Sequence, residues 1–121
     1  MFDLTNKVVL ITGATGGIGG AIARAMKNVG ATVVVSGRRE EKLNQEFDDS
    51  FIKIVADLSK DDAANNLITD TIARAGKIDV LINNAGITMD TLMMRMTDAQ
   101  FDDVINTNLR AAFKTCRAVL M

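Results

Sequence analysis

The sequence predicts an α/β fold in which helices cover both faces of a doubly wound parallel sheet. Two observations predict this fold class. Short apolar runs rich in β-branched residues alternate with longer helical patterns, and a glycine-rich segment directly follows the first apolar run. Strands that alternate with helices favour parallel pairing through right-handed crossovers. We expect one domain over residues 1–121, a length at which about two-thirds of the unfolded surface can be buried.

The expected elements follow in order along the chain. Strands are expected at residues 7–12, 32–37, 51–56 and 78–83. The first, second and fourth are apolar on both faces, as strands buried between helix layers must be. Helices are expected at residues 16–30, 39–49, 60–76 and 97–121, and the segment 85–97 is predicted to be a loop or a broken helix. Gly30 and Gly76 stand where C-terminal caps belong, and Thr97 with Gln100 forms a capping-box pattern.

The composition excludes several classes of function. The chain has 14 Lys and Arg residues against 15 Asp and Glu residues, so no net positive field attracts nucleic acid or anionic lipid. The N-terminus lacks a signal-peptide run, and no stretch approaches the roughly 20 apolar residues of a membrane span. The single cysteine, Cys116, cannot form an internal disulfide, and no metal site is predicted. We expect a cytoplasmic protein that binds neither nucleic acid nor membrane.

The segment "ITGATGGIGG" (11–20) has the composition of a phosphate-binding turn. Such a turn needs glycines where the chain bends sharply and where a Cβ would hold a pyrophosphate away, followed by a helix N-terminus that faces the anion. Glycines also serve tight packing, but the position between a first strand and a first helix favours nucleotide binding. The predicted contacts come from the turn and the helix start: Gly13, Ala14, Thr15, Gly16, Gly17, Ile18 and Gly19.

Four motifs together resemble those of one enzyme family. They are T-G-x-x-x-G-x-G (12–19), "DL" (57–58), "NNAG" (83–86) and "NTN" (106–108). In this order and spacing they are similar to the motifs of short-chain dehydrogenases/reductases, and the resemblance covers the whole chain. It implies a Rossmann-like sheet in strand order 3-2-1-4 with flanking helices, bound to a nicotinamide dinucleotide.

The end of the second expected strand indicates which dinucleotide binds. Gly37 stands where a carboxylate would meet the ribose hydroxyls of NAD, and Arg38 follows as a cation for the 2′-phosphate of NADP. We therefore predict NADP(H). Alternatively, Arg38 is a solvated charge at a helix start. Asp57, with the Leu58 backbone, is the adenine contact that the resemblance implies, and it also suits a helix N-terminus.

The two asparagine motifs have roles that the resemblance implies. Asn84 and Gly86 are expected beside the nicotinamide ribose, although turn formation explains Asn84 equally well. Asn108 lies in the middle of an expected helix, where asparagine is unfavourable. By resemblance Asn108 belongs to the catalytic set and holds a water in a proton relay.

The segment 86–109 is similar to the same segment of bacterial 3-oxoacyl-[acyl-carrier-protein] reductases, which have a basic residue where Met89 stands here. This similarity implies NADPH-dependent reduction of a 3-oxoacyl thioester on acyl carrier protein, in fatty acid synthesis, by a homo-oligomer. A methionine cluster in this segment suits either a thioester-lining or a gap-filling role: Met89, Met93, Met94 and Met96.

The residues that perform proton transfer in this family are not all present. By resemblance a tyrosine protonates the alkoxide, a lysine lowers the pKa of that tyrosine, and a serine holds the carbonyl oxygen. The chain contains no tyrosine. We therefore expect a truncated sheet with a bare fourth strand and an unpartnered last helix, inactive alone and part of a larger parent or of an assembly. The alternatives are a non-catalytic NADP(H)-binding fragment or pseudoenzyme, or a short-chain dehydrogenase for another carbonyl or alcohol.

Overall fold

The computed structural model describes residues 3–84, 97–104, 109 and 111–120. The strands of the described part are β1 (Val8–Ile11), β2 (Thr32–Gly37), β3 (Ile52–Val55) and β4 (Val80–Ile82). The helices of the described part are α1 (Gly17–Asn28), α2 (Glu40–Glu46), α3 (Ala63–Ala75), α4 (Asp98–Val104) and α5 (Ala111–Leu120). Each predicted strand and each of the first three predicted helices is present, with ends that differ by a few residues.

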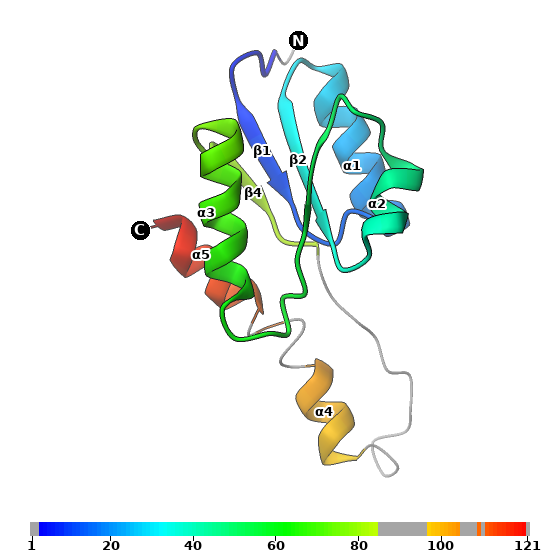
Figure 1. The fold of residues 1–121 in the computed structure, drawn as a ribbon, viewed down its shortest axis with the longest axis vertical. Helices are drawn as coiled ribbons and strands as arrows, with labels where there is room; N and C mark the ends of the chain where they lie inside the picture. The colour runs from blue at the N-terminus through cyan, green and yellow to red at the C-terminus, as the bar shows by residue number, and fades with distance from the viewer. Residues whose placement is uncertain (1–2, 85–96, 105–108, 110, 121) are drawn as a thin grey trace.

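The strands form one parallel sheet in the order β3-β2-β1-β4, which confirms the predicted topology (Figure 1). Leu10 of β1 lies opposite Val34 of β2 and Leu81 of β4. Because every pairing is parallel, the carboxyl ends of the strands share one edge of the sheet. The turns that follow β1, β2 and β4 are therefore brought together there.

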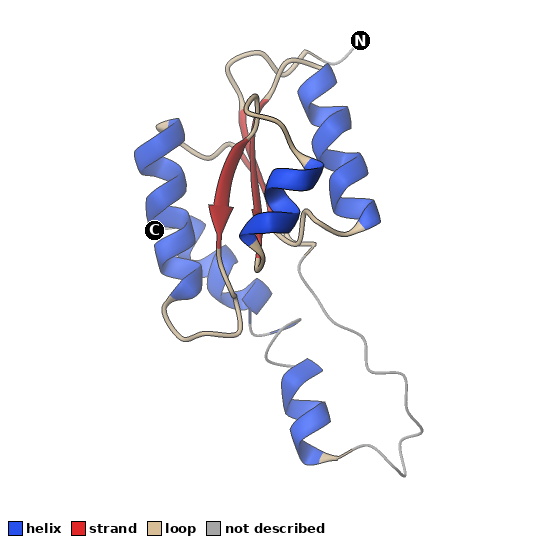
Figure 2. Ribbon diagram, turned by 45° about the vertical axis from the view of Figure 1, so that its right-hand side comes forward, coloured by secondary structure: helices blue, strands red, loops and turns tan. Residues whose placement is uncertain are grey.

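Helices α1 and α2 cover one face of the sheet, and α3 and α5 cover the other (Figures 1 and 2). Alternate residues of each central strand enter different cores, as the period of two in a strand requires. The core beneath α1 and α2 contains buried side chains from Val9, Ile11, Ala23, Val33, Val35, Leu43 and Phe47. The core beneath α3 and α5 contains Val8, Leu10, Val34, Ile54, Leu58, Leu67, Ile68 and Ala111.

Two glycines end helices as the sequence predicted. Gly76 is the C-cap of α3 with φ of 90°, and its N–H donates to the Ile72 carbonyl over 2.8 Å. Gly30 follows the end of α1 with φ of 97°. Both angles lie in the left-handed region, which favours glycine because a Cβ is strained there.

The chain after residue 97 differs from the single predicted helix. The capping box is confirmed, since the Thr97 N–H donates to Gln100 Oε1 over 2.9 Å and the Gln100 N–H donates to Thr97 Oγ1 over 3.1 Å. The structure then contains two helices, α4 and α5, in place of one. The sequence between them includes Asn-Thr-Asn (106–108), three residues of low helix propensity that lie outside the described residues.

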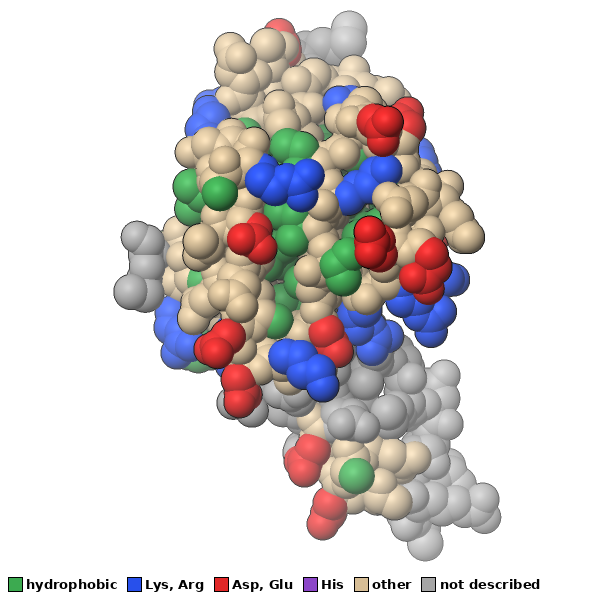
Figure 3. Space-filling view, in the orientation of Figure 1, with side chains coloured by type: hydrophobic (Ala, Val, Ile, Leu, Met, Phe, Trp, Pro, Cys, Tyr) green, Lys and Arg blue, Asp and Glu red, His purple; other side chains and the backbone are tan. Residues whose placement is uncertain are grey.

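The surface mixes both signs of charge. On the face seen in Figure 3, lysines and arginines are interspersed with aspartates and glutamates over the helices and the sheet edge. No helix among the described residues is both long enough and apolar enough to cross a bilayer. An anion that binds this molecule must therefore be held by local geometry, because no broad field of one sign gathers it on this face.

Candidate functional site

The turn after β1 is held by backbone hydrogen bonds to both neighbouring strands. The Thr12 N–H donates to the Ile82 carbonyl at the end of β4 over 3.1 Å, and the Ala14 N–H donates to the Ser36 carbonyl of β2 over 3.0 Å. Between them Gly13 has φ of 62°, a left-handed conformation that a residue with a Cβ rarely adopts. The turn is thus fixed against the sheet before helix α1 begins.

Helix α1 begins without a capping side chain. Its N-cap is Gly16, and its first turn, "GIGG", contains no acidic residue. The first N–H groups of a helix have no partner within the helix. A Cβ on Gly17 would meet no described atom within 4 Å, and the Ile18 side chain is 72% exposed. The positive end of the helix dipole is therefore not covered by any described side chain at the carboxyl edge of the sheet, which suits a phosphate group.

Gly19 serves close packing. A Cβ at this position would lie 2.6 Å from the Gly13 carbonyl oxygen, 2.7 Å from Asn84 Nδ2 and 3.0 Å from Ala14 Cα. These distances are far shorter than van der Waals contact, so only glycine lets the first turn of α1 approach the turn after β1. The sequence placed Gly19 among the nucleotide contacts, and its position beneath the turn gives it the role of bringing the helix start close.

Asn84 joins the turn after β4 to the turn after β1. Its backbone N–H donates to Thr12 Oγ1 over 3.1 Å, and its side-chain Nδ2 donates to the Gly13 carbonyl over 3.0 Å. Partly buried polar groups that are bonded in this way hold the backbone in place, because breaking either bond leaves a polar atom that is only partly accessible to water without its partner. Of the two sequence interpretations, the described contacts match the turn-forming one, and they place Asn84 directly behind Gly13.

Asn83 makes a second link, from the end of β4 to helix α5. Its Oδ1 accepts from the Thr115 hydroxyl over 2.7 Å, and its Nδ2 donates to Cys116 Sγ over 3.3 Å. The Thr115 side chain is fully buried and Cys116 is exposed. Sequence reasoning did not identify Thr115. The available signal was a hydroxyl residue on the apolar face of an amphipathic helix, where a buried polar atom requires a partner.

The end of β2 and the residues after β3 bring a cation near a carboxylate. Arg38 is exposed directly after β2, and Asp57 follows β3, the neighbouring strand. The Ser59 hydroxyl hydrogen bond is the largest influence and lowers the pKa of Asp57 below its usual value; partial burial opposes this, while the Ser59 N–H and the positive charge of Arg38 assist it. Asp57 is therefore ionised at neutral pH, and Leu58 beside it is buried in the core beneath α3.

Three aspartates share this local arrangement and predict how stability depends on pH. Asp3, Asp48 and Asp57 each accept hydrogen bonds from the hydroxyl and the N–H of the residue two positions later, which lower the pKa of each below the usual 3.8. A carboxylate whose folded pKa lies below its unfolded pKa stabilises the fold at higher pH, and this contribution is lost as the pH falls through the folded pKa. We expect the free energy of unfolding to decrease below about pH 4.

Urea unfolding at a series of pH values measures this dependence. In the Ser59→Ala variant the pKa of Asp57 moves back toward its usual value, so we expect less stability near neutral pH and a shallower decline toward acid. Parallel curves for the variant and the wild type would contradict this assignment.

Several predicted residues lie outside the described part of the chain. They are Gly86, the second predicted contact beside the nicotinamide ribose, Asn108, the predicted catalytic residue, and the methionines Met89, Met93, Met94 and Met96.

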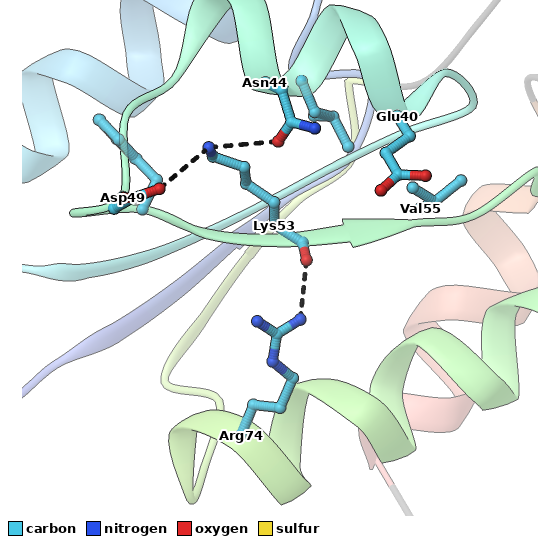
Figure 4. A pocket seen from close by; sticks show the side chains of 8 residues that line it. Glu40, Asn44, Asp49, Lys53, Val55 and Arg74 are labelled. Carbon is cyan, nitrogen blue, oxygen red and sulfur yellow. Dashed lines mark hydrogen bonds and ion pairs between the residues drawn. The ribbon is translucent and has the colours of Figure 1, made fainter.

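A cavity of about 330 Å³ lies along the outer edge of β3, between α2 and α3 (Figure 4). Its cations already have partners. Lys53 Nζ lies 3.4 Å from Asn44 Oδ1 and 3.9 Å from Asp49 Oδ1, and Arg74 Nη1 donates to the Lys53 carbonyl over 2.7 Å. None of the lining residues belongs to the glycine-rich turn. The cavity is therefore separate from the phosphate-binding geometry at the start of α1.

With this geometry established, sequence comparison identifies the family. The short chain dehydrogenase profile matches residues 7–121, and the chain belongs to that family. It is 48% identical over 116 residues to the 3-oxoacyl-[acyl-carrier-protein] reductase FabG of Rickettsia conorii, covering 93% of this chain and 46% of that protein. It is 44% identical over 120 residues to Nodulation protein G of a Rhizobium species, covering 97% of this chain and 49% of that protein.

Solved structures show the same fold. A short chain dehydrogenase from Mycobacterium smegmatis superposes with a TM-score of 0.91 at 37% identity, covering 98% of this chain and 54% of the other. A short-chain dehydrogenase/reductase from Brucella melitensis gives a TM-score of 0.92 at 32% identity, with 98% and 52% covered. The chain spans about half the length of the curated relatives it matches, 46% and 49% in the two cases above.

Proposed function

We propose that this chain binds NADP(H) and forms the nucleotide-binding half of a short-chain reductase. The observation that supports this most is the uncapped start of α1, which opens to space at Gly17 and is held against the carboxyl ends of β1, β2 and β4. A dinucleotide pyrophosphate is the ligand that this arrangement suits in a doubly wound sheet. Gly13, Ala14, Thr15, Gly16 and the α1 start would surround it.

The preference for NADP over NAD rests on the end of β2. Gly37 has no carboxylate to meet two ribose hydroxyls, and the exposed guanidinium of Arg38 is available for a 2′-phosphate. Arginine suits phosphate because its planar fork of donors matches the phosphate oxygens. Asp57, kept ionised by Ser59, would accept from the adenine amino group, with the Leu58 backbone alongside.

Replacing Arg38 tests this preference. We expect Arg38→Ala to weaken NADPH binding about 10- to 100-fold, since hydrogen bonds to charged groups contribute about 1.5–3 kcal/mol. NADH binding should be unchanged, because NADH has no 2′-phosphate. Calorimetric titration of both nucleotides measures the two affinities, and Arg39→Ala, the adjacent exposed arginine, is the matched control. An equal loss of affinity for both nucleotides would show that Arg38 does not bind the 2′-phosphate.

For the whole protein we propose reduction of a 3-oxoacyl thioester on acyl carrier protein, in the cytoplasm, as part of fatty acid synthesis. This rests on the two relatives that are 48% and 44% identical, of which the Rickettsia conorii protein is named for that reaction. NADPH supplies the hydride in such a reduction when it is bound. The proposed role of this chain is to bind and orient the dinucleotide, with Asn108 as its contribution to proton transfer.

Turnover by this chain alone is not expected. The 121 residues include no tyrosine and no histidine, so neither residue can act as the general acid here. Exposed apolar side chains on α5 and at the sheet edge support either association between copies or contact with further chain: Val80, Phe113 and Leu120. A reductase assay with an acyl carrier protein thioester tests this expectation, since sustained turnover by the chain alone would contradict it.

A further inference from the structure

On β2, the row of side chains that faces α1 and α2 ends at Gly37, a residue without a side chain. Val33 and Val35 are fully buried in the core on that side, and Gly37 is the next residue on the same face. Gly37 belongs to the extended strand β2, a backbone conformation that accepts any side chain. A side chain at this position would begin in contact with Thr15 and Leu43. An added Cβ would lie 3.2 Å from Thr15 Cγ2, 3.6 Å from Thr15 Oγ1 and 3.5 Å from Leu43 Cδ2.

Only the Thr15 methyl contact is tighter than ordinary van der Waals separation. Thr15 cannot withdraw easily, because the backbone on both sides of it is bonded. The Ala14 N–H donates to the Ser36 carbonyl over 3.0 Å, and the Gly16 N–H donates to the Gly13 carbonyl over 3.3 Å. The first of these bonds ties the turn to β2 at the residue next to Gly37. Thr15 is therefore pressed onto the end of β2 by the same turn that forms the start of the phosphate site.

We propose that Thr15 is a specificity determinant, whose methyl group closes the end of β2 to the acidic side chain that recognition of NAD requires. In doubly wound sheets this strand end provides a carboxylate to the ribose hydroxyls when NAD is the ligand. Here Thr15 occupies the space where such a side chain would begin. The inference rests on the proposed nucleotide site. It adds to the attraction between Arg38 and the 2′-phosphate of NADP a steric reason why no carboxylate at this strand end binds the ribose hydroxyls of NAD.

The steric step can be tested by stability alone. Gly37→Ala adds only the Cβ, so we expect it to lower the unfolding midpoint, since overpacking a closed site destabilises. Thr15→Ser removes the methyl that makes the 3.2 Å contact and should relieve most of this loss in the double variant. Thr15→Val keeps a methyl at the β-carbon, removes the hydroxyl and should give no relief. If Gly37→Ala lowered the unfolding midpoint equally in the wild type, in Thr15→Ser and in Thr15→Val, the Thr15 methyl would not be the cause of the loss.

The specificity step is tested by titration with NADH and NADPH. Gly37→Asp alone should weaken the binding of NADPH without strengthening the binding of NADH, because the methyl of Thr15 keeps the new carboxylate from reaching its position. Gly37→Asp with Thr15→Ser should bind NADH about tenfold more tightly than Gly37→Asp alone. If Gly37→Asp raised the affinity for NADH equally with and without Thr15→Ser, the role of Thr15 would be overturned, while the proposed nucleotide site would remain. Failure of the wild type to bind either nucleotide would instead overturn the proposed function, while the stability comparison still decides the contact.

Discussion

Replacing Gly19 with alanine should abolish nucleotide binding and destabilise the fold by about 3 kcal/mol, the upper part of the range for overpacked sites. The added Cβ would lie 2.6 Å from the Gly13 carbonyl oxygen and 2.7 Å from Asn84 Nδ2. The first is a backbone atom held in a bonded turn, so the strain cannot be relieved by rotation of a side chain. The start of α1 must then move away from the turn after β1, and the phosphate geometry is lost with it.

Gly17→Ala is the matched control, two residues away in the same helix turn. Its Cβ meets no described atom within 4 Å, so the fold should be unharmed, and about 0.5 kcal/mol more stable because alanine restricts the unfolded chain. Nucleotide binding should still weaken, since the same methyl projects into the space offered to the phosphate. Urea unfolding and nucleotide titration of both variants separate the two effects. Similar stabilities for the two variants would contradict the packing role of Gly19.

Phe47→Ala should destabilise the protein by about 3–5 kcal/mol, the range for removing a buried aromatic side chain. Phe47 is 2% exposed at the end of α2, in the core beneath α1. Its ring centroid lies 4.9 Å from that of Phe51, and the Arg24 guanidinium carbon lies 5.5 Å from the Phe47 ring centroid. The variant leaves a cavity in this core, and the Phe51 ring loses the aromatic ring that it packs against.

Phe51→Ala provides the comparison for Phe47. Phe51 packs at the margin of the same core and is only partly buried, with Lys27 Nζ 5.6 Å from its ring centroid. Its removal should cost less, because less apolar area leaves the core and solvent can fill part of the space. Urea unfolding of the two variants gives the two free energies. If the two losses were the same, the buried position of Phe47 would not be the cause of its effect.

The fold could be predicted because its signals are local and repeated. Each apolar run is followed by a helical pattern, and this alternation favours parallel pairing. The 3-2-1-4 order followed from the resemblance of the motifs to those of short-chain dehydrogenases/reductases. Gly76 and the Thr97–Gln100 pair could be placed because caps depend on neighbouring residues. The single helix expected over 97–121 was wrong, since the described part of this range forms two helices, α4 and α5, and an apolar period alone does not show where one helix ends and the next begins.

The site was predicted in outline, and its internal contacts were not. Asn84 could be selected as a polar residue after β4, but its bond to the Gly13 carbonyl joins residues 71 positions apart and depends on how the turns meet. The same holds for Thr115, which bonds Asn83 from a helix 32 positions later. The packing of Thr15 on Gly37 is a further case, because no local pattern shows that a missing side chain is replaced by a methyl from another turn.

Arg74 occupies one of the outward-facing hydrogen-bonding groups of β3, the edge strand of the sheet. A parallel strand presents the N–H and carbonyl groups of alternate residues outward, and on β3 the Lys53 carbonyl is one of these outward groups. A strand from another molecule would need that oxygen as an acceptor, yet Arg74 already donates to it, and the charged side chain of Lys53 lies on the same edge. Such edge protection opposes aggregation by strand addition, so β3 is a poor template for extending the sheet into a second copy of the chain.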